Sequence, residues 1–181
     1  MKTEFFSALL FLAISSPYFT IEKNTREVLI ENAGWSAESQ YKLGLECFTG
    51  SAGVPQDYKQ AMQWFLKAAI QGHSGAQFKC AVMYENGYGV QEDSGQAALW
   101  YEKAAEQSIT AAQYAIGLMY YEGSGVEIDM VKAYFWLNLA AATGYKDSVL
   151  NRDILEDNLT PDQLKAAGRM AQDWKEKHPG K

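Results

Sequence analysis

Cysteine and histidine are the side chains of this sequence best suited to nucleophilic, redox or metal chemistry. The two cysteines, Cys47 and Cys80, do not form a C-x-x-C pair, and the two histidines, His73 and His178, lie in different parts of the chain. Such separate positions indicate neither a nucleophile beside its base nor a set of metal ligands. We expect buried cysteines and surface histidines, and we predict a protein that is not an enzyme and has no cofactor.

Carboxylates, the other candidates for chemistry, recur at a fixed interval instead of clustering. Asp57, Asp93 and Asp129 are 36 residues apart. Each directly precedes a predicted helix, where a short carboxylate accepts hydrogen bonds from unpaired backbone amides and meets the positive end of the helix dipole. Three aspartates at three helix starts indicate helix caps rather than a catalytic or metal-binding site. Gln60 and Gln96, three residues further on, predict two capping boxes.

The same interval extends to residues that build helices and loops. Four further sets of three share it: Gly53, Gly89 and Gly125; Ala61, Ala97 and Ala133; Trp64, Trp100 and Trp136; and Ala68, Ala104 and Ala140. The alanines and tryptophans fall on one face of a helix, and glycine adopts the positive φ that commonly ends one. We therefore predict three stacked units, each a helix A, a glycine loop and a helix B, with helices at 37–49 and 58–71 in the first.

These units predict how the whole chain is divided. We expect a degenerate half repeat, three repeats and C-terminal capping helices, at residues 20–35, 36–72, 73–108, 109–144 and 145–181. The last helix begins at Thr160-Pro-Asp-Gln163, which is a capping box with proline at the first helical position. Its residues Leu164, Ala167, Met170, Ala171 and Trp174 form one apolar stripe. Because a terminal repeat otherwise leaves an apolar face in water, we expect this helix to cover it.

The first 19 residues resemble a short secretory signal. Lys2 precedes an apolar run from Phe5 to Ile14, and small residues follow it. The run is too short to span a bilayer, which needs about 20 apolar residues, so we predict no stable membrane insertion of the mature chain. We expect a periplasmic or secreted protein. The alternative is an apolar N-terminal helix that covers the first repeat of a cytoplasmic protein.

The overall charge argues against one class of partner. The chain has 16 basic and 22 acidic residues, for a formal net charge of −6. This charge repels a phosphate backbone, so we do not expect nucleic acid binding.

The third unit carries the pattern of a known repeat. The pattern consists of Ala112 to Tyr120, Gly123 to Val126, Asp129, Ala133, Trp136 and the pair Ala140-Ala141. It resembles the Sel-one-like repeat, a relative of the tetratricopeptide repeat. The resemblance implies an all-α fold, a right-handed α/α superhelix, and an adaptor that binds another protein or peptide, in bacteria often in envelope or secretion roles.

The resemblance to tetratricopeptide arrays also implies a binding groove lined by the A helices. The side chains expected to point into it are Tyr41, Leu45, Phe48, Phe78, Val82, Glu85, Tyr114, Leu118 and Tyr121. Such an aromatic surface with acidic spots suits an extended or helical peptide that carries basic residues. Tyr41, Phe78 and Tyr114 recur with the repeat and so are also candidates for the core. The less regular Phe48, Glu85 and Tyr121 are the better candidates for contact.

Two alternative functions remain open from the sequence. Cysteine-rich bacterial members of the family tie helix A to helix B with a disulfide, and some were proposed to bind or hydrolyse β-lactams. Here both cysteines lie on A helices, so that bridge cannot form and an envelope hydrolase is the weaker reading; a bridge between the neighbouring A helices stays open. The other alternative is a self-assembling structural protein, because exposed ends of a solenoid can stack.

Overall fold

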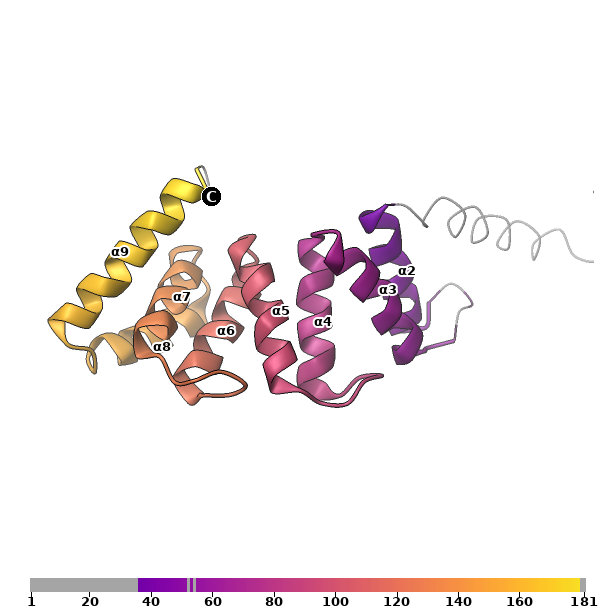
Figure 1. Ribbon diagram of the computed structural model, residues 1–181, viewed down its shortest axis with the longest axis horizontal. Helices are drawn as coiled ribbons and strands as arrows, with labels where there is room; N and C mark the ends of the chain where they lie inside the picture. Colours follow the sequence, from indigo (N-terminus) through magenta and orange to yellow (C-terminus); the bar gives the residue numbers. More distant parts are fainter. Residues whose placement is uncertain (1–35, 52, 54, 180–181) are drawn as a thin grey trace, which may run out of the picture.

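The computed structural model describes residues 36–51, 53 and 55–179 of the 181-residue chain (Figure 1). The expected signal peptide or apolar helix at 1–19 and the expected half repeat at 20–35 lie outside the described residues.

Eight α-helices and no strands make up the described part of the chain. They are α2 (Ala37–Thr49), α3 (Tyr58–Ile70), α4 (Ser74–Asn86), α5 (Ser94–Glu106), α6 (Thr110–Glu122), α7 (Met130–Ala142), α8 (Lys146–Glu156) and α9 (Pro161–Lys177). Helices pack as the pairs α2–α3, α4–α5 and α6–α7, and each pair packs against the helix that follows it. Figure 1 shows them side by side in one row, with α8 and α9 at the far end from α2. The predicted all-α solenoid of helix-turn-helix units is confirmed.

Helix B of each repeat begins at the predicted aspartate. The carboxylates of Asp57 and Asp93 each accept a hydrogen bond from the backbone amide three residues later at 2.9 Å, and Asp129 accepts two, from Val131 and Lys132, at 3.0 Å. The expected capping boxes at Asp57 and Asp93 are both wrong in their second half, because only the aspartate side chain takes part in each cap. The Gln60 side chain instead accepts a hydrogen bond from Cys47 Sγ at 3.1 Å, because that thiol lies beside the helix start.

Glycine ends each helix A, and a second glycine brings neighbouring repeats into contact. Gly89 and Gly125 have φ angles of 71° and 70°. A Cβ on Gly89 would lie 2.4 Å from the backbone carbon of Tyr58, and one on Gly125 would lie 2.2 Å from that of Ser94. The loop of each later repeat therefore rests directly on the start of helix B in the repeat before it. Gly53 occupies the same place in the first repeat, and no described atom lies within 4 Å of its added Cβ.

Small residues also let the two helices of a repeat approach closely. A Cβ on Gly44 would lie 2.5 Å from the Phe65 ring, and one on Gly117 would lie 2.8 Å from Leu137 Cγ. Phe65 and Leu137 are fully buried, and so are the repeated alanines of helix B. Since each unit buries its faces against its neighbours, the core runs continuously along the stack.

The C-terminal helix departs from the repeat plan. Helix α8 packs on α7 as each earlier A helix packs on the B helix before it. Helix α9 would be the B helix of a fourth unit, but it packs across α7. Its capping box is present as predicted, with Thr160 and Gln163 exchanging hydrogen bonds of 2.9 Å and 3.3 Å. Ala167 of its apolar stripe is buried, and Met170, Ala171 and Trp174 pack against the core.

Candidate functional site

The cysteines are buried side chains on two neighbouring A helices. Cys47 on α2 is 2% exposed and Cys80 on α4 is 0% exposed, and the two are not joined by a disulfide. Burial raises the pKa of the Cys80 thiol to about 12, so this side chain is protonated and a poor nucleophile at neutral pH. The expectation of buried cysteines is confirmed.

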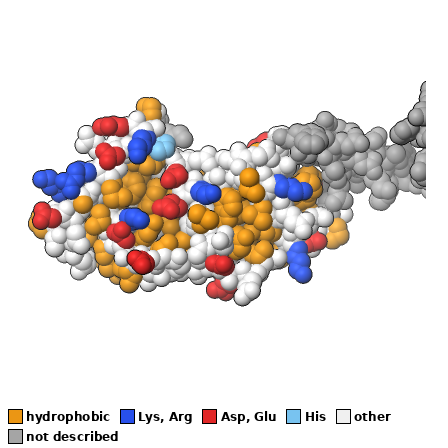
Figure 2. Space-filling model, in the orientation of Figure 1, with side chains coloured by type: hydrophobic (Ala, Val, Ile, Leu, Met, Phe, Trp, Pro, Cys, Tyr) orange, Lys and Arg blue, Asp and Glu red, His pale blue; other side chains and the backbone are white. Residues whose placement is uncertain are grey.

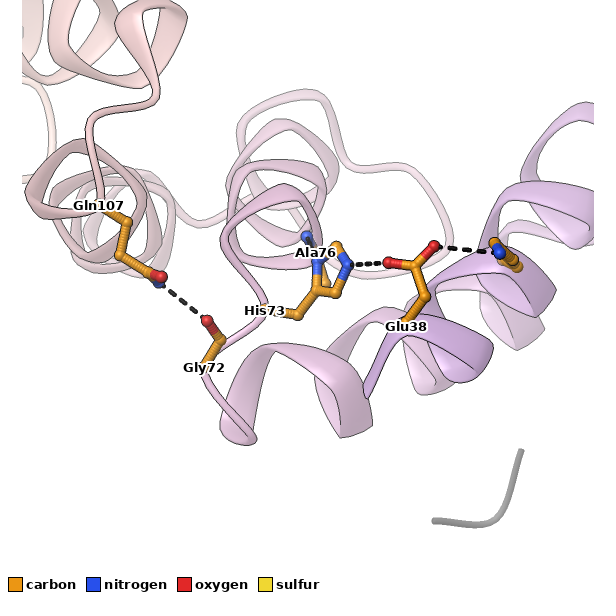
Figure 3. Close-up of polar contacts among 6 residues, drawn as sticks. Glu38, Gly72, His73, Ala76 and Gln107 are labelled. Carbon is orange, nitrogen blue, oxygen red and sulfur yellow. Dashed lines mark hydrogen bonds and ion pairs between the residues drawn. The ribbon is translucent and has the colours of Figure 1, made fainter. Parts of the chain in front are cut away.

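His73 is not the surface histidine that the sequence predicts (Figure 3). It is the N-cap residue of α4, and its Nδ1 accepts a hydrogen bond from the Ala76 amide at 3.1 Å. Its Nε2 lies 3.0 Å from Glu38 Oε2, and its ring stacks on Tyr41 with centroids 4.4 Å apart. Hydrogen bonds from His73 and Lys42 hold the pKa of Glu38 below its usual value. His73 thus joins the first repeat to the second.

Buried glutamines hold the same junctions, a role that sequence reasoning missed. Gln77 donates to the Ala69 carbonyl and Gln113 donates to the Ala105 carbonyl, both at 3.2 Å, and each bond joins a repeat to the one before it. Gln107 also donates to the Gly72 carbonyl at 3.0 Å, in the contact drawn in Figure 3. The signal was present in the sequence, because a polar residue recurs within an apolar helix A. In the second and third repeats its partner carbonyl belongs to the preceding repeat, which spacing alone does not reveal.

Among the described residues, no group of three or more His, Cys, Asp and Glu side chains is placed to hold a metal ion. No helix in the described part of the chain is long and apolar enough to cross a membrane.

The predicted groove residues that recur with the repeat pack along the stack. Tyr41 stacks on His73, and Tyr114 lies 5.1 Å from Tyr145 between ring centroids. His73 and Tyr145 are both N-cap residues of the next A helix. Phe78, in the same position of the second repeat, instead lies 5.7 Å from Tyr101 of its own repeat. All three groove side chains are half-buried against the core, so folding accounts for much of their surface.

The less regular groove residues divide into bound and open positions. Phe48 lies among Tyr58, Phe65 and Tyr88, with centroid distances of 5.1, 6.2 and 6.1 Å. Glu85 accepts a hydrogen bond of 2.6 Å from the buried Tyr101 hydroxyl, which together with burial raises the pKa of Tyr101.

Four of the nine predicted groove residues have no such ring contact or hydrogen bond. Tyr121 is 42% exposed, and Leu45, Val82 and Leu118 occupy one register position of the three A helices and are half-buried.

A second surface lies on the B helices, where sequence analysis predicted no site. Two positions of helix B, four residues apart, lie outside the repeated pattern of alanines and tryptophans: Gln63 and Lys67 on α3, Leu99 and Lys103 on α5, and Phe135 and Leu139 on α7. The first position differs in every repeat, and the second is lysine in the first two repeats and leucine in the third. We call these six residues the outer strip. Those on α3 and α5 are exposed, with Leu99 at 44%, whereas Phe135 and Leu139 are only 4% and 7% exposed. Helix α9 packs on α7, and we attribute the burial of these two side chains to it.

Helix α9 packs on a surface of α7 that includes Phe135, and we call this surface the α9 seat. The α9 seat extends toward the uncovered part of the outer strip. A pocket of about 500 Å³ lies between α9 and helices α5 and α7, and its lining residues are Glu106, Phe135, Trp136, Met170, Asp173, Trp174, Lys177 and His178. His178 stacks on Trp174 with centroids 4.3 Å apart, so this histidine also packs at the end of α9 rather than standing free. Glu106 ends α5, so the pocket joins the α9 seat to that helix.

Comparison with known families agrees with this repeat architecture. The Sel1 repeat matches residues 37–73, 74–109 and 110–145, which together make up more than half of the chain. The chain belongs to the Sel1 repeat family. This confirms the resemblance seen in the sequence. Sel1-repeat proteins are generally protein-interaction modules and non-catalytic scaffolds.

Solved Sel1-type structures share the fold. A protective antigen present in uropathogenic Escherichia coli strains, with an SLR fold, is 32% identical over 78% of this chain and 38% of its own, with a TM-score of 0.63. A Sel1 repeat protein from Oxalobacter formigenes is 30% identical over 76% of this chain and 56% of its own, with a TM-score of 0.70. This Sel1 chain therefore matches between about four-tenths and just over half of the length of these two proteins.

A third structure shares the fold at lower identity. The cysteine-rich protein B of Helicobacter pylori is 23% identical over 71% of this chain and 95% of its own, with a TM-score of 0.53. No curated protein matches the chain.

Proposed function

We propose that this Sel1-repeat chain is a non-catalytic adaptor that binds a segment of another protein on its A helices. The observation that carries the proposal is that the strictly repeated positions already have structural roles in the fold. Recurring aspartates, glycines, glutamines and alanines are used in caps, close approaches, junctions and the core. Specific recognition then falls to the groove positions that have none of these roles, because their side chains are free to match one partner.

The proposed contact surface is the part of the predicted groove whose side chains are exposed or lie partly buried at the edge of the core and make no ring contact or hydrogen bond among the described residues. It consists of Leu45, Val82, Leu118 and Tyr121, which offer aliphatic and aromatic area on successive A helices. Apolar side chains at a regular interval suit an amphipathic or extended segment, which gains affinity from several shallow contacts at once.

Affinity capture from the native cell with paired variants tests the proposed groove. Val82→Ala with Tyr121→Ala removes two proposed contacts, and we expect recovery of the bound protein to fall at least tenfold. Ile128→Ala with Met130→Ala is the matched control just before and at the start of α7, where both side chains are exposed, and we expect unchanged recovery. Equal capture by wild type and the groove variant would show that the partner binds elsewhere.

We also propose that the protein works in the bacterial envelope or outside the cell. The support is the signal-like pattern of Lys2 and the apolar run from Phe5 to Ile14. Sequencing the N-terminus of the mature protein from its native cell tests this. A mature chain that begins after Ile14 supports export, whereas a chain that retains Met1 and Lys2 contradicts it.

One observation supports self-assembly as the second candidate function. Leu150 and Ile154 on α8 occupy the positions that Tyr114 and Leu118 occupy on α6, but no further A helix follows in the described part of the chain, and they are 63% and 49% exposed. An open end of this kind can pack against another repeat. Light scattering across a concentration series would show a rising mass in wild type and a constant mass in the variant with Leu150→Ala and Ile154→Ala.

A further inference from the structure

We infer that the open part of the outer strip, on α3 and α5, is a second docking surface, and that its occupant is a partner's amphipathic helix with acidic flanks. The inference deepens the proposed adaptor function and depends on it for its biological meaning. The interaction chemistry, however, comes from a different face of the protein from the A-helix groove.

The chain itself shows what kind of element covers this strip. In the third repeat the strip positions are Phe135 and Leu139, and both are buried where α9 packs across α7. The covering element is a helix with one apolar stripe, of which Ala167 is 1% exposed. The equivalent positions of the second repeat, Leu99 and Lys103, lie on a helix of the same length and cap. A helix that lies across α5 would therefore meet the same backbone surface that α9 meets on α7.

The open strip is continuous with the α9 seat. Glu106 at the end of α5 lines the same pocket as Met170, Trp174 and Lys177 of α9. At the other side, the hydrogen bond from Gln107 to the Gly72 carbonyl joins the ends of α5 and α3. Figure 2 shows two separate gatherings of apolar side chains on one face of the molecule, one toward the α7–α9 end and one toward α3 and α4, with basic side chains at the edge of the second.

Charge distinguishes the expected occupant from α9 itself. The ammonium of Lys67 lies 4.3 Å from the Trp64 ring centroid, and that of Lys103 lies 4.8 Å from the Trp100 centroid. Neither ammonium forms an ion pair with a described carboxylate. The register position of these lysines is Leu139 in the covered repeat, so the lysines appear only where the strip is open. Two cations held over aromatic faces beside exposed Leu99 and Ile70 favour a helix whose apolar stripe is flanked by carboxylates.

The carboxylates nearby do not cancel this charge. Glu102 accepts a hydrogen bond from the Tyr120 hydroxyl at 3.0 Å. Glu106 shares its pocket with Lys177 and His178 of α9. The charge of the two strip lysines therefore remains available to an incoming helix on α3 and α5.

A synthetic helix tests the docking surface without a known partner. The probe is a fluorescent peptide of residues 160–179 in which the lysines and the arginine are replaced by glutamate, which keeps the apolar stripe of α9 and gives it acidic flanks. We expect it to bind the full chain saturably, and at least tenfold more tightly than the unaltered peptide. In NMR spectra the indole N–H signals of Trp64 and Trp100 should shift, while that of Trp136 beneath α9 should not.

Charge-reversal variants provide the matched control. Lys67→Glu with Lys103→Glu should weaken binding of the acidic peptide at least tenfold. Lys146→Glu with Lys165→Glu makes the same change in net charge on α8 and on the exposed side of α9, and should leave binding within twofold. Circular dichroism confirms that both variants keep the helical fold.

Three results overturn the inference. One is no saturable binding of the acidic peptide, and another is equal binding by the two charge-reversal variants. The third is tighter binding of the unaltered peptide together with a shift at Trp136, which would mean that the peptide displaces α9. Failure here leaves the adaptor function intact if affinity capture still depends on Val82 and Tyr121. Failure of that capture experiment with successful peptide binding would contradict the A-helix groove alone.

Discussion

Helices α5 and α7 occupy the same place in successive repeats, yet the outer strip of one is in solvent and that of the other lies beneath α9. Their caps and the spacing of their tryptophans are the same. At the two strip positions, Leu99 and Lys103 stand on α5 where Phe135 and Leu139 stand on α7. The same position in the repeat is thus covered by the last helix on α7 and exposed to solvent on α5. The covered strip carries two apolar side chains, and the exposed strip carries one apolar side chain and one lysine.

The largest expected effect comes from truncating the strip at equivalent positions. Phe135→Ala removes a ring that is 4% exposed beneath α9, and we expect it to lower the free energy of unfolding by about 3–5 kcal/mol, because it leaves a cavity in a packed interface. Leu99→Ala removes a side chain that is 44% exposed, so we expect a loss of less than about 1 kcal/mol. Urea unfolding of the two variants measures the contrast. Equal losses would mean that α9 does not bury the strip of α7.

The coupling between α5 and α7 depends on Gly125. Its added Cβ would overlap the backbone of Ser94 at the start of α5, and its φ of 70° strains any other residue. We expect Gly125→Ala to lower the free energy of unfolding by about 2–4 kcal/mol, from overpacking and backbone strain together.

Gly53→Ala is the control for Gly125. Gly53 has a similar φ of 77°, but no described atom lies near its added Cβ. We expect a loss of only about 1 kcal/mol, from strain alone. Thermal unfolding of both variants separates the two causes, and equal shifts in Tm would argue that the contact with α5 contributes nothing.

The sequence predicted the helices, their ends and their pairing well, because these features depend on local signals that repeat. The aspartate caps, the glycine helix ends and the capping box at Thr160 depend on a few neighbouring residues, and the structure has all of them. A periodic pattern also predicted the stacked helix pairs and the family.

The surfaces were harder to predict because they depend on contacts between units. His73 was expected at the surface, but it caps α4 and contacts Glu38 of the preceding repeat. Phe48, expected in the groove, packs on Tyr88 of the next loop. The stripe of α9 was visible in the sequence, but the choice of α7 as its seat follows from Phe135 and the three-dimensional course of the chain. Positions that differ between repeats carry no periodic signal.

Removing the N-cap of α9 should weaken its packing on α7 without changing the packed side chains. Thr160→Ala removes the hydroxyl that accepts a hydrogen bond from Gln163, and we expect the helix to lose about 1 kcal/mol. Because α9 covers Phe135, hydrogen exchange should speed up in α9 and in the adjoining part of α7. Asp93→Ala removes the cap of α5 at similar cost. That control should speed exchange in α5 and leave α9 unchanged, so acceleration of α9 by both variants would contradict separate opening of the cover.

The smallest expected effect concerns the lysines of the open strip. Lys103→Ala removes a cation over the Trp100 ring at an exposed site, and we expect a loss of about 0.5–1 kcal/mol in the free energy of unfolding. Lys67→Ala should behave alike, because the ammonium of Lys67 stands over Trp64 at a similar distance.

Lys103→Leu instead recreates on α5 the side chain that α7 carries under α9, and should cost no more stability than Lys103→Ala. Chemical denaturation gives the stabilities, and analytical ultracentrifugation follows association. If the leucine variant stays as soluble and monodisperse as wild type, lysine is not needed to keep the open strip apart from other apolar helices; if it associates, the charge at this position is what separates an open strip from a covered one.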